Sequence, residues 1–108
     1  MNRRQELSRK IYEAGFKACN RRIGLNKSIA YFSVDWCWKM LPKKIKVNIE
    51  YEALTGEWYR KKELQEIFLA NNCIGYPIYN VQIKNSLHEA LLELVCWCID
   101  NGHIKAVK

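Results

Sequence analysis

The side chains with the widest chemical range in this 108-residue chain are two histidines and five cysteines. Nucleophilic catalysis needs a base beside the nucleophile. His88 falls at the second position of a predicted helix, which is typically a surface site. His103 falls just past the end of that helix, where it would face the carbonyl end of the helix dipole. The chain also has no Gly-rich phosphate loop, H-E-x-x-H, D-x-D or G-x-S-x-G sequence. We therefore predict no enzymatic activity and no cofactor.

The cysteines do not form a metal-binding pattern. No C-x-x-C pair occurs, and Cys96 and Cys98 are about 200° apart around a helix axis, so they cannot bind one metal ion together. An odd number of cysteines without an export signal favours reduced thiols. No apolar run is long enough to span a membrane, and the N-terminus lacks the apolar segment of a signal peptide. We expect a cytoplasmic protein without a metal site.

The positive charge is concentrated at the N-terminus. Residues 1–27 carry eight Lys or Arg against two Glu, a net +6 of the total +7. Residues 3–20 predict a basic amphipathic helix. Glu6 with Lys10 and Glu13 with Lys17 are spaced as i, i+4 ion pairs, which is typical of a solvated helix face. The alternative is a face that binds phosphates.

Basic and aromatic residues alternate again around a predicted hairpin. Residues 46–53 alternate between apolar and polar side chains, and Thr55-Gly56 indicates a turn before a short second strand. This hairpin would bring Lys43, Lys44 and Lys46 to the same end as the basic run 60–62. Lysines at strand ends also protect a sheet edge from aggregation, so this pattern supports two interpretations. Under the nucleic-acid interpretation, the contacting residues are Arg21, Arg22, Lys43, Lys44, Arg60, Lys61 and Lys62.

The strongest structural signal is a C-terminal helix. Ser86 and Glu89 have the spacing of a capping box, apolar residues follow at helical spacing from Leu87 to Cys98, and Gly102 provides a stop. A second apolar row lies on the opposite side of this helix. Either the domain covers this row on both sides, or it is an exposed patch that a partner closes. On the second reading, the residues of the partner interface are Leu92, Cys96, Trp97 and Ile99, and the simplest partner is a second copy of the chain.

The remaining segments predict the fold class. Residues 20–28 are expected to form a loop, and residues 29–41 fit either a strand or, as we prefer, a helix from 34 to 41. Residues 64–70 fit a helix or an extended segment, residues 71–77 a turn, and residues 78–84 a third strand. We predict one α+β domain over residues 1–108, with a basic helix and loop (1–27) and a core (28–108). In that core, a small antiparallel sheet of about three strands is covered by the C-terminal helix.

One resemblance adds a genomic context. The order of Ser33-Val-Asp-Trp-Cys-Trp-Lys-Met-Leu41, Lys46-Val-Asn-Ile-Glu-Tyr51, Tyr79-Asn-Val-Gln-Ile83 and Ser86-Leu-His-Glu-Ala-Leu-Leu-Glu-Leu94 resembles small uncharacterised proteins of phages and mobile elements in gut Bacteroidales. The resemblance covers about residues 30–102 and implies a fold but no site. We expect an accessory protein that binds itself or another protein, with non-specific nucleic-acid binding as the alternative.

Overall fold

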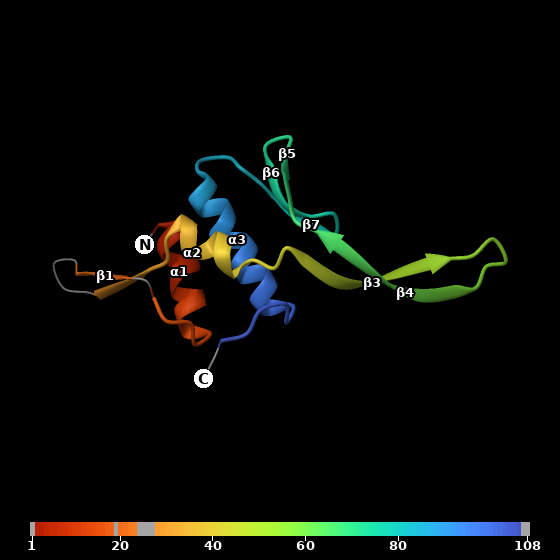
Figure 1. Ribbon diagram of the computed structural model, residues 1–108, viewed down its shortest axis with the longest axis horizontal. Coiled ribbons are helices and arrows are strands. Elements are labelled where there is room, and N and C mark those ends of the chain that lie inside the picture. The colour runs from red at the N-terminus through yellow and green to blue at the C-terminus, as the bar shows by residue number, and fades with distance from the viewer. Residues whose placement is uncertain (1, 19, 24–27, 107–108) are drawn as a thin grey trace.

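The computed structural model describes residues 2–18, 20–23 and 28–106, except for the side chains of residues 20–23, 28 and 29. Its helices are α1 (Arg3–Glu13), α2 (Val34–Met40) and α3 (Leu87–Asp100). Its strands are β1 (Asn20–Ile23), β2 (Ser28–Tyr31), β3 (Lys44–Glu52), β4 (Trp58–Glu66), β5 (Phe68–Ala70), β6 (Cys73–Tyr76) and β7 (Tyr79–Gln82). The predicted α+β class, with one helix near each end of the chain, is confirmed (Figure 1).

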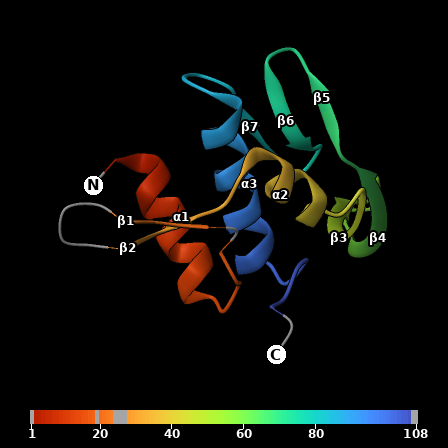
Figure 2. The same cartoon turned by 60° about the vertical axis from the view of Figure 1, so that its left-hand side comes forward.

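Helix α3 is the centre of the hydrophobic core. The amide of Glu89 donates to the Ser86 hydroxyl at 3.1 Å, which confirms the predicted N-cap. At the other end, the amides of Gly102 and His103 donate to the carbonyls of Ile99 and Cys98, and Gly102 has a φ of +74°. These two bonds form a Schellman motif. Helices α1 and α2 and strands β6 and β7 all contact α3 (Figure 2).

The N-terminal part of the chain, before α2, differs from the prediction at two places. Helix α1 ends at Glu13, because Gly15 adopts a φ of +102° and the chain then turns to bury Phe16. The predicted loop at 20–28 is wrong where it is described, since residues 20–23 and 28 belong to the antiparallel pair β1–β2. Its proposed turn residues, Gly24 and Asn26, lie outside the described residues.

The preferred helical reading of residues 34–41 is confirmed by α2. Its N-terminus is capped by Ser33, whose hydroxyl accepts from the Trp36 amide at 3.1 Å. Of residues 29–41, only residues 29–31 form a strand, which is the end of β2.

The three-stranded sheet has a different membership from the predicted one. It contains β5, β6 and β7, all antiparallel, whereas the predicted hairpin forms a separate two-stranded sheet of β3 and β4. Residues 73–76, predicted as part of a turn, are strand β6. Within residues 71–77, the turns are at Asn71 and Asn72, which adopt φ values of 52° and 61°, and at Pro77, just before β7. The third predicted strand is present as β7, with Val81 buried and Asn80 and Gln82 exposed.

The β3–β4 hairpin projects from the helical body as an arm (Figure 1). Each strand has nine residues and spans about 27 Å at the usual rise per residue. The molecule measures 63 × 34 × 22 Å, and its radius of gyration is 16.5 Å. A compact chain of this length has a radius of gyration of about 13 Å. The prediction of a short second strand is wrong, because a ribbon held by its own cross-strand bonds can leave Arg60, Lys61 and Lys62 in solvent.

Candidate interaction surfaces

The base of the arm is fixed to the body by buried contacts. Ile45 and Val47 belong to the hydrophobic core, and Gln65 of β4 is only 7% exposed. The side-chain carbonyl of Gln65 accepts from the amide of Ile78 at 2.8 Å, which ties β4 to the turn before β7. The hydroxyl of Tyr76, itself fully buried, donates to the carbonyl of Pro42 at 2.6 Å. These contacts set the direction in which the arm leaves the body.

The outer half of the arm exposes large apolar side chains. Trp58 is 67% exposed and Tyr59 is 53% exposed, and Leu54 lies fully exposed in the connecting turn. Tyr59 stacks on Tyr51 of the opposite strand, with ring centroids 5.5 Å apart. A two-stranded ribbon is marginally stable by itself in water, and clustered exposed apolar side chains are typical of contact sites. The distal arm is therefore the strongest candidate for a contact with another molecule.

The strand register separates the basic residues that the sequence had suggested would gather. Lys44 is opposite Glu66, Lys46 is opposite Leu64, and Lys62 is opposite Asn48. Lys44 and Lys46 are four and two positions from Asn48, so along the strand they lie about 13 Å and about 7 Å from Lys62, and Arg60, opposite Glu50, lies farther toward the tip. The prediction that six positive charges gather at one end of the hairpin is therefore wrong. The second strand is longer than predicted, which moves residues 60–62 toward the tip.

Several of these basic side chains already have partners within the chain. Arg60 forms an ion pair with Glu50 at 3.1 Å, and Lys44 forms one with Glu66 at 3.4 Å. The Lys43 ammonium group lies 3.7 Å from the centre of the Trp38 ring, a cation–π contact. Lys61 and Lys62 are exposed, and neither is in an ion pair among the described residues.

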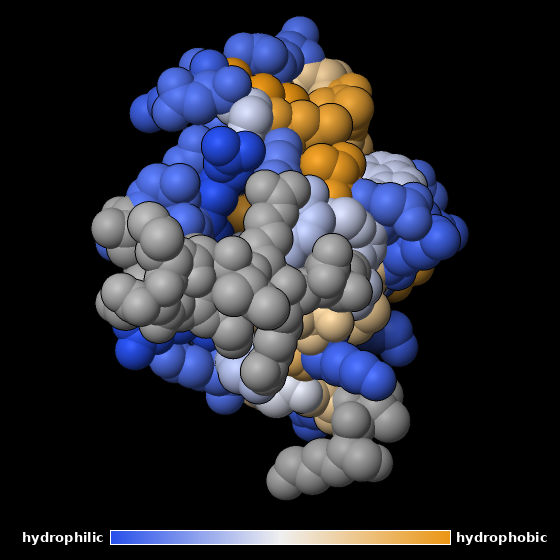
Figure 3. Space-filling model, turned by 90° about the vertical axis from the view of Figure 1, so that its left-hand side faces the viewer, coloured by the Kyte–Doolittle hydropathy of each residue, from blue (hydrophilic) through white to orange (hydrophobic). Residues whose placement is uncertain are grey.

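The N-terminal basic segment is divided between paired and solvated side chains. Arg3 lies 3.0 Å from Glu93 of α3, and Arg9 lies 2.9 Å from Glu13. Both arginines belong to the N-terminal segment that the sequence offers as an alternative phosphate-binding face, and these ion pairs neutralise their charge within the chain. Arg21 and Arg22 are in β1, paired with Ala30 and Ile29, and their side chains lie outside the described part of the chain. The end of the molecule from which β1–β2 projects is hydrophilic over much of its surface (Figure 3).

The second apolar row of α3 is largely covered by the chain itself. Leu92 is 0% exposed and belongs to the core, so it is not available to a partner, and its place in the proposed interface is wrong. Cys96 is half-buried, and its thiol donates to the carbonyl of Leu7 in α1 at 3.6 Å. Trp97 is half-buried and stacks on Tyr79 at 4.7 Å, with His103 at 5.1 Å. Ile99 is also half-buried and packs against the core.

The surroundings of Cys96, Cys98 and His88 indicate roles in packing and in holding segments of the fold together. Burial raises the pKa of Cys96 and that of Cys98 from 9.0 to about 11, so both thiols stay protonated well above neutral pH. The Nε2 atom of His88 is 2.6 Å from the carbonyl oxygen of Phe32 and connects α3 to the segment before α2. Within the described residues, no group of three or more His, Cys, Asp or Glu side chains could hold a metal ion.

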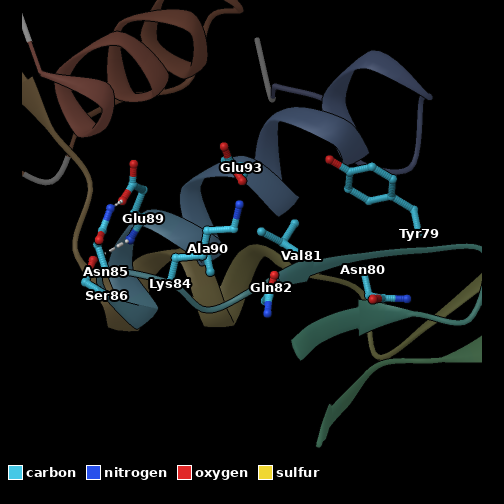
Figure 4. A pocket seen from close by; sticks show the side chains of 10 residues that line it. All are labelled: Tyr79, Asn80, Val81, Gln82, Lys84, Asn85, Ser86, Glu89, Ala90 and Glu93. Atoms are coloured by element: carbon cyan, nitrogen blue, oxygen red, sulfur yellow. Dashed lines mark hydrogen bonds between the residues drawn. The ribbon is translucent and has the colours of Figure 1, made fainter. Parts of the chain in front are cut away.

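A half-open groove of about 310 Å³ lies between β7 and the first half of α3 (Figure 4). Its ionisable side chains are Lys84, Glu89, Glu93 and, at one end, Tyr79. Glu93 forms an ion pair with Arg3, and the Glu89 carboxylate accepts a hydrogen bond from the side-chain amide of Asn85 at 3.5 Å. The hydroxyl of Ser86 in the same groove is already used as the helix cap. This arrangement contains no nucleophile with an adjacent base.

Sequence reasoning missed two residues of the arm. Leu54 directly precedes the Thr55-Gly56 turn, and an apolar residue at the tip of a hairpin was the available signal. Gln65 gave no signal, because its burial depends on the turn before β7, which is distant in the sequence.

Among the described residues, no helix has the length and apolar character needed to cross a membrane. Comparison of the chain with family models, curated proteins and solved structures found no match.

Proposed function

We propose that this chain is a non-catalytic interaction protein that contacts another protein through the β3–β4 arm. The observation that carries the proposal is the projecting ribbon itself, with Leu54, Trp58 and Tyr59 exposed around its tip. Aromatic side chains of this kind often anchor protein interfaces, because they bury a large area with few rotatable bonds. The α3 row, in contrast, contributes side chains that already pack within the domain.

The charge of the arm favours a protein partner over a nucleic acid. The whole arm, residues 44–66, carries five basic and five acidic side chains, so it has no net positive charge, and its outermost residues 50–60 contain Arg60 against three glutamates. Nucleic-acid binding depends on cations that neutralise phosphates, and duplex DNA carries one phosphate charge for about every 1.7 Å. An arm whose charges balance has no net attraction to that charge. Non-specific nucleic-acid binding therefore stays as the competing hypothesis, with Arg21, Arg22, Lys61 and Lys62 as its residues.

Site-specific photo-cross-linking tests the proposal. A photoreactive phenylalanine derivative is placed at Trp58 and, as the control, at Leu87, which is also exposed but lies at the start of α3. The chain is expressed in its native host and irradiated. We expect a protein adduct from position 58 that survives nuclease treatment, and a much weaker adduct from position 87.

Two results would contradict the proposal. An adduct from position 58 that nuclease removes would identify a nucleic acid as the partner. Strong protein adducts from position 87 with none from position 58 would place the interface away from the arm.

A further inference from the structure

The outer edge of β3 is open. Among the strands that the structure describes, β4 alone pairs with β3, and the two form a separate sheet. An open strand edge presents a row of N–H and C=O groups to solvent, and these groups can pair with another strand. Natural edges are commonly protected by proline, by a bulge or by charged side chains, which repel a second copy unless opposite charges face each other. The sequence of β3, Lys-Ile-Lys-Val-Asn-Ile-Glu-Tyr-Glu, has no proline, and its charges are of both signs.

The hydrogen bonds at the two ends of the hairpin show which residues of β3 face this edge. The amide of Ala53 donates to the carbonyl of Glu57 at 2.8 Å, and the amide of Ile67 donates to the carbonyl of Lys43 at 2.9 Å. Bonded pairs alternate along an antiparallel ladder. The odd-numbered residues of β3 therefore bond to β4. The main-chain groups of the even-numbered residues point to the open edge: Lys44, Lys46, Asn48, Glu50 and Glu52.

The charges of these same residues would face opposite charges if the β3 strand of a second copy lay antiparallel to this one. If two β3 strands run antiparallel with Asn48 at the centre, Lys46 is opposite Glu50 of the second copy. Lys44 is likewise opposite Glu52 of the second copy. Each pair occurs twice by symmetry, and the five pairs would exchange about ten main-chain hydrogen bonds. On the other face, Val47 is opposite the second copy's Ile49, and Ile45 is opposite its Tyr51.

Other registers keep fewer of these opposite-charge pairs. A shift of the centre to Val47 leaves Lys46 opposite Asn48 and keeps only the Lys44–Glu50 pair. A shift to Ile49 leaves Glu50 opposite Asn48 and keeps only the Lys46–Glu52 pair. A centre between two residues would place charged side chains opposite apolar ones. The open edge of β4 is less suitable, because its self-pairing around Lys62 puts the two Lys62 ammonium groups opposite each other.

We propose that two copies of this chain associate through the β3 edges, with Asn48 at the two-fold axis, to form a continuous four-stranded antiparallel sheet. The ion pairs within each arm extend the alternation of charge across this sheet. Glu50 lies between Arg60 of its own hairpin and Lys46 of the second copy, and Lys44 lies between Glu66 and the second copy's Glu52. The antiparallel arrangement also brings the tip of each arm beside the base of the other. The inference rests on the proposed function, since it names the second copy as a partner of the arm.

Charge reversal on β3 tests this inference. An acidic-edge variant carries Lys44→Glu and Lys46→Glu, and a basic-edge variant carries Glu50→Lys and Glu52→Lys. In either homodimer, like charges face each other at every charged pair, so the dissociation constant should rise by about tenfold or more. An equal mixture of the two variants restores every opposite-charge pair and should form a heterodimer. Sedimentation equilibrium in the micromolar range measures all three samples and the unchanged protein.

The matched control is Lys61→Glu with Lys62→Glu, which changes the net charge as much as the acidic-edge variant but lies on β4. This control should keep the dimer, and circular dichroism confirms that each variant is folded. Asn48→Pro provides a second block of the edge, because it removes a main-chain donor that the hairpin does not use.

An unchanged protein that is monomeric throughout this range would overturn the inference. So would acidic-edge and basic-edge variants that dimerise as well as the unchanged chain, or a mixture that forms no heterodimer. These outcomes differ from failure of the proposed function, which is measured separately by cross-linking from position 58. A monomer that still cross-links other proteins from the tip would refute the inference and leave the proposed function in place.

Discussion

The anchoring of the arm gives a prediction with a defined magnitude. Gln65→Leu keeps the approximate size of a side chain that is 7% exposed but removes the acceptor of the 2.8 Å bond from the Ile78 amide. Loss of one such bond, with partial replacement by water, costs about 1–2 kcal/mol. We therefore expect the free energy of unfolding to fall by this amount and the Ile78 amide to exchange with solvent roughly tenfold faster.

Urea unfolding and native-state hydrogen exchange measure these two quantities. Gln82→Leu is the matched control, because Gln82 is an exposed glutamine on β7 and the same chemical change there should alter stability little. If the Gln65 and Gln82 variants have equal stability and equal protection at Ile78, the bond does not hold the arm and the reasoning is wrong.

The other predictions concern helix α3. Leu92→Ala should lower the free energy of unfolding by about 2–5 kcal/mol in urea titrations, whereas Leu87→Ala, at an exposed position, should change it far less; a stable Leu92 variant that loses only self-association would instead support an interface on α3. Because burial raises the pKa of Cys96 and Cys98 from 9.0 to about 11, the two thiols contribute stability that is present below pH 9 and is lost as the pH rises toward 11. Urea midpoints across this range should fall less in Cys96→Ala than in the unchanged chain, and an identical fall in both would show that other groups cause it.

Local signals predicted the parts of this protein whose stabilising contacts are close in sequence. Ser33 and Ser86 cap α2 and α3 because a cap depends on an amide three residues away. The alternation in residues 46–53 and 78–84 identified strands for the same reason, since the inward and outward positions follow the two-residue period. The fold class followed from these elements.

The tertiary structure alone decided which surfaces are open. The apolar row of α3 could be covered or exposed, and α1 and the core decide this by burying Leu92 and by contacting Cys96. The basic residues of the hairpin were grouped by their position in the sequence, but the register places Glu50 and Glu66 beside Arg60 and Lys44. The length of β4 also depended on distant contacts, because Gln65 and Pro42 are held by the segment around β6 and β7. Sequence periodicity indicates which face of an element is apolar, but only the packing of distant segments determines whether that face is covered.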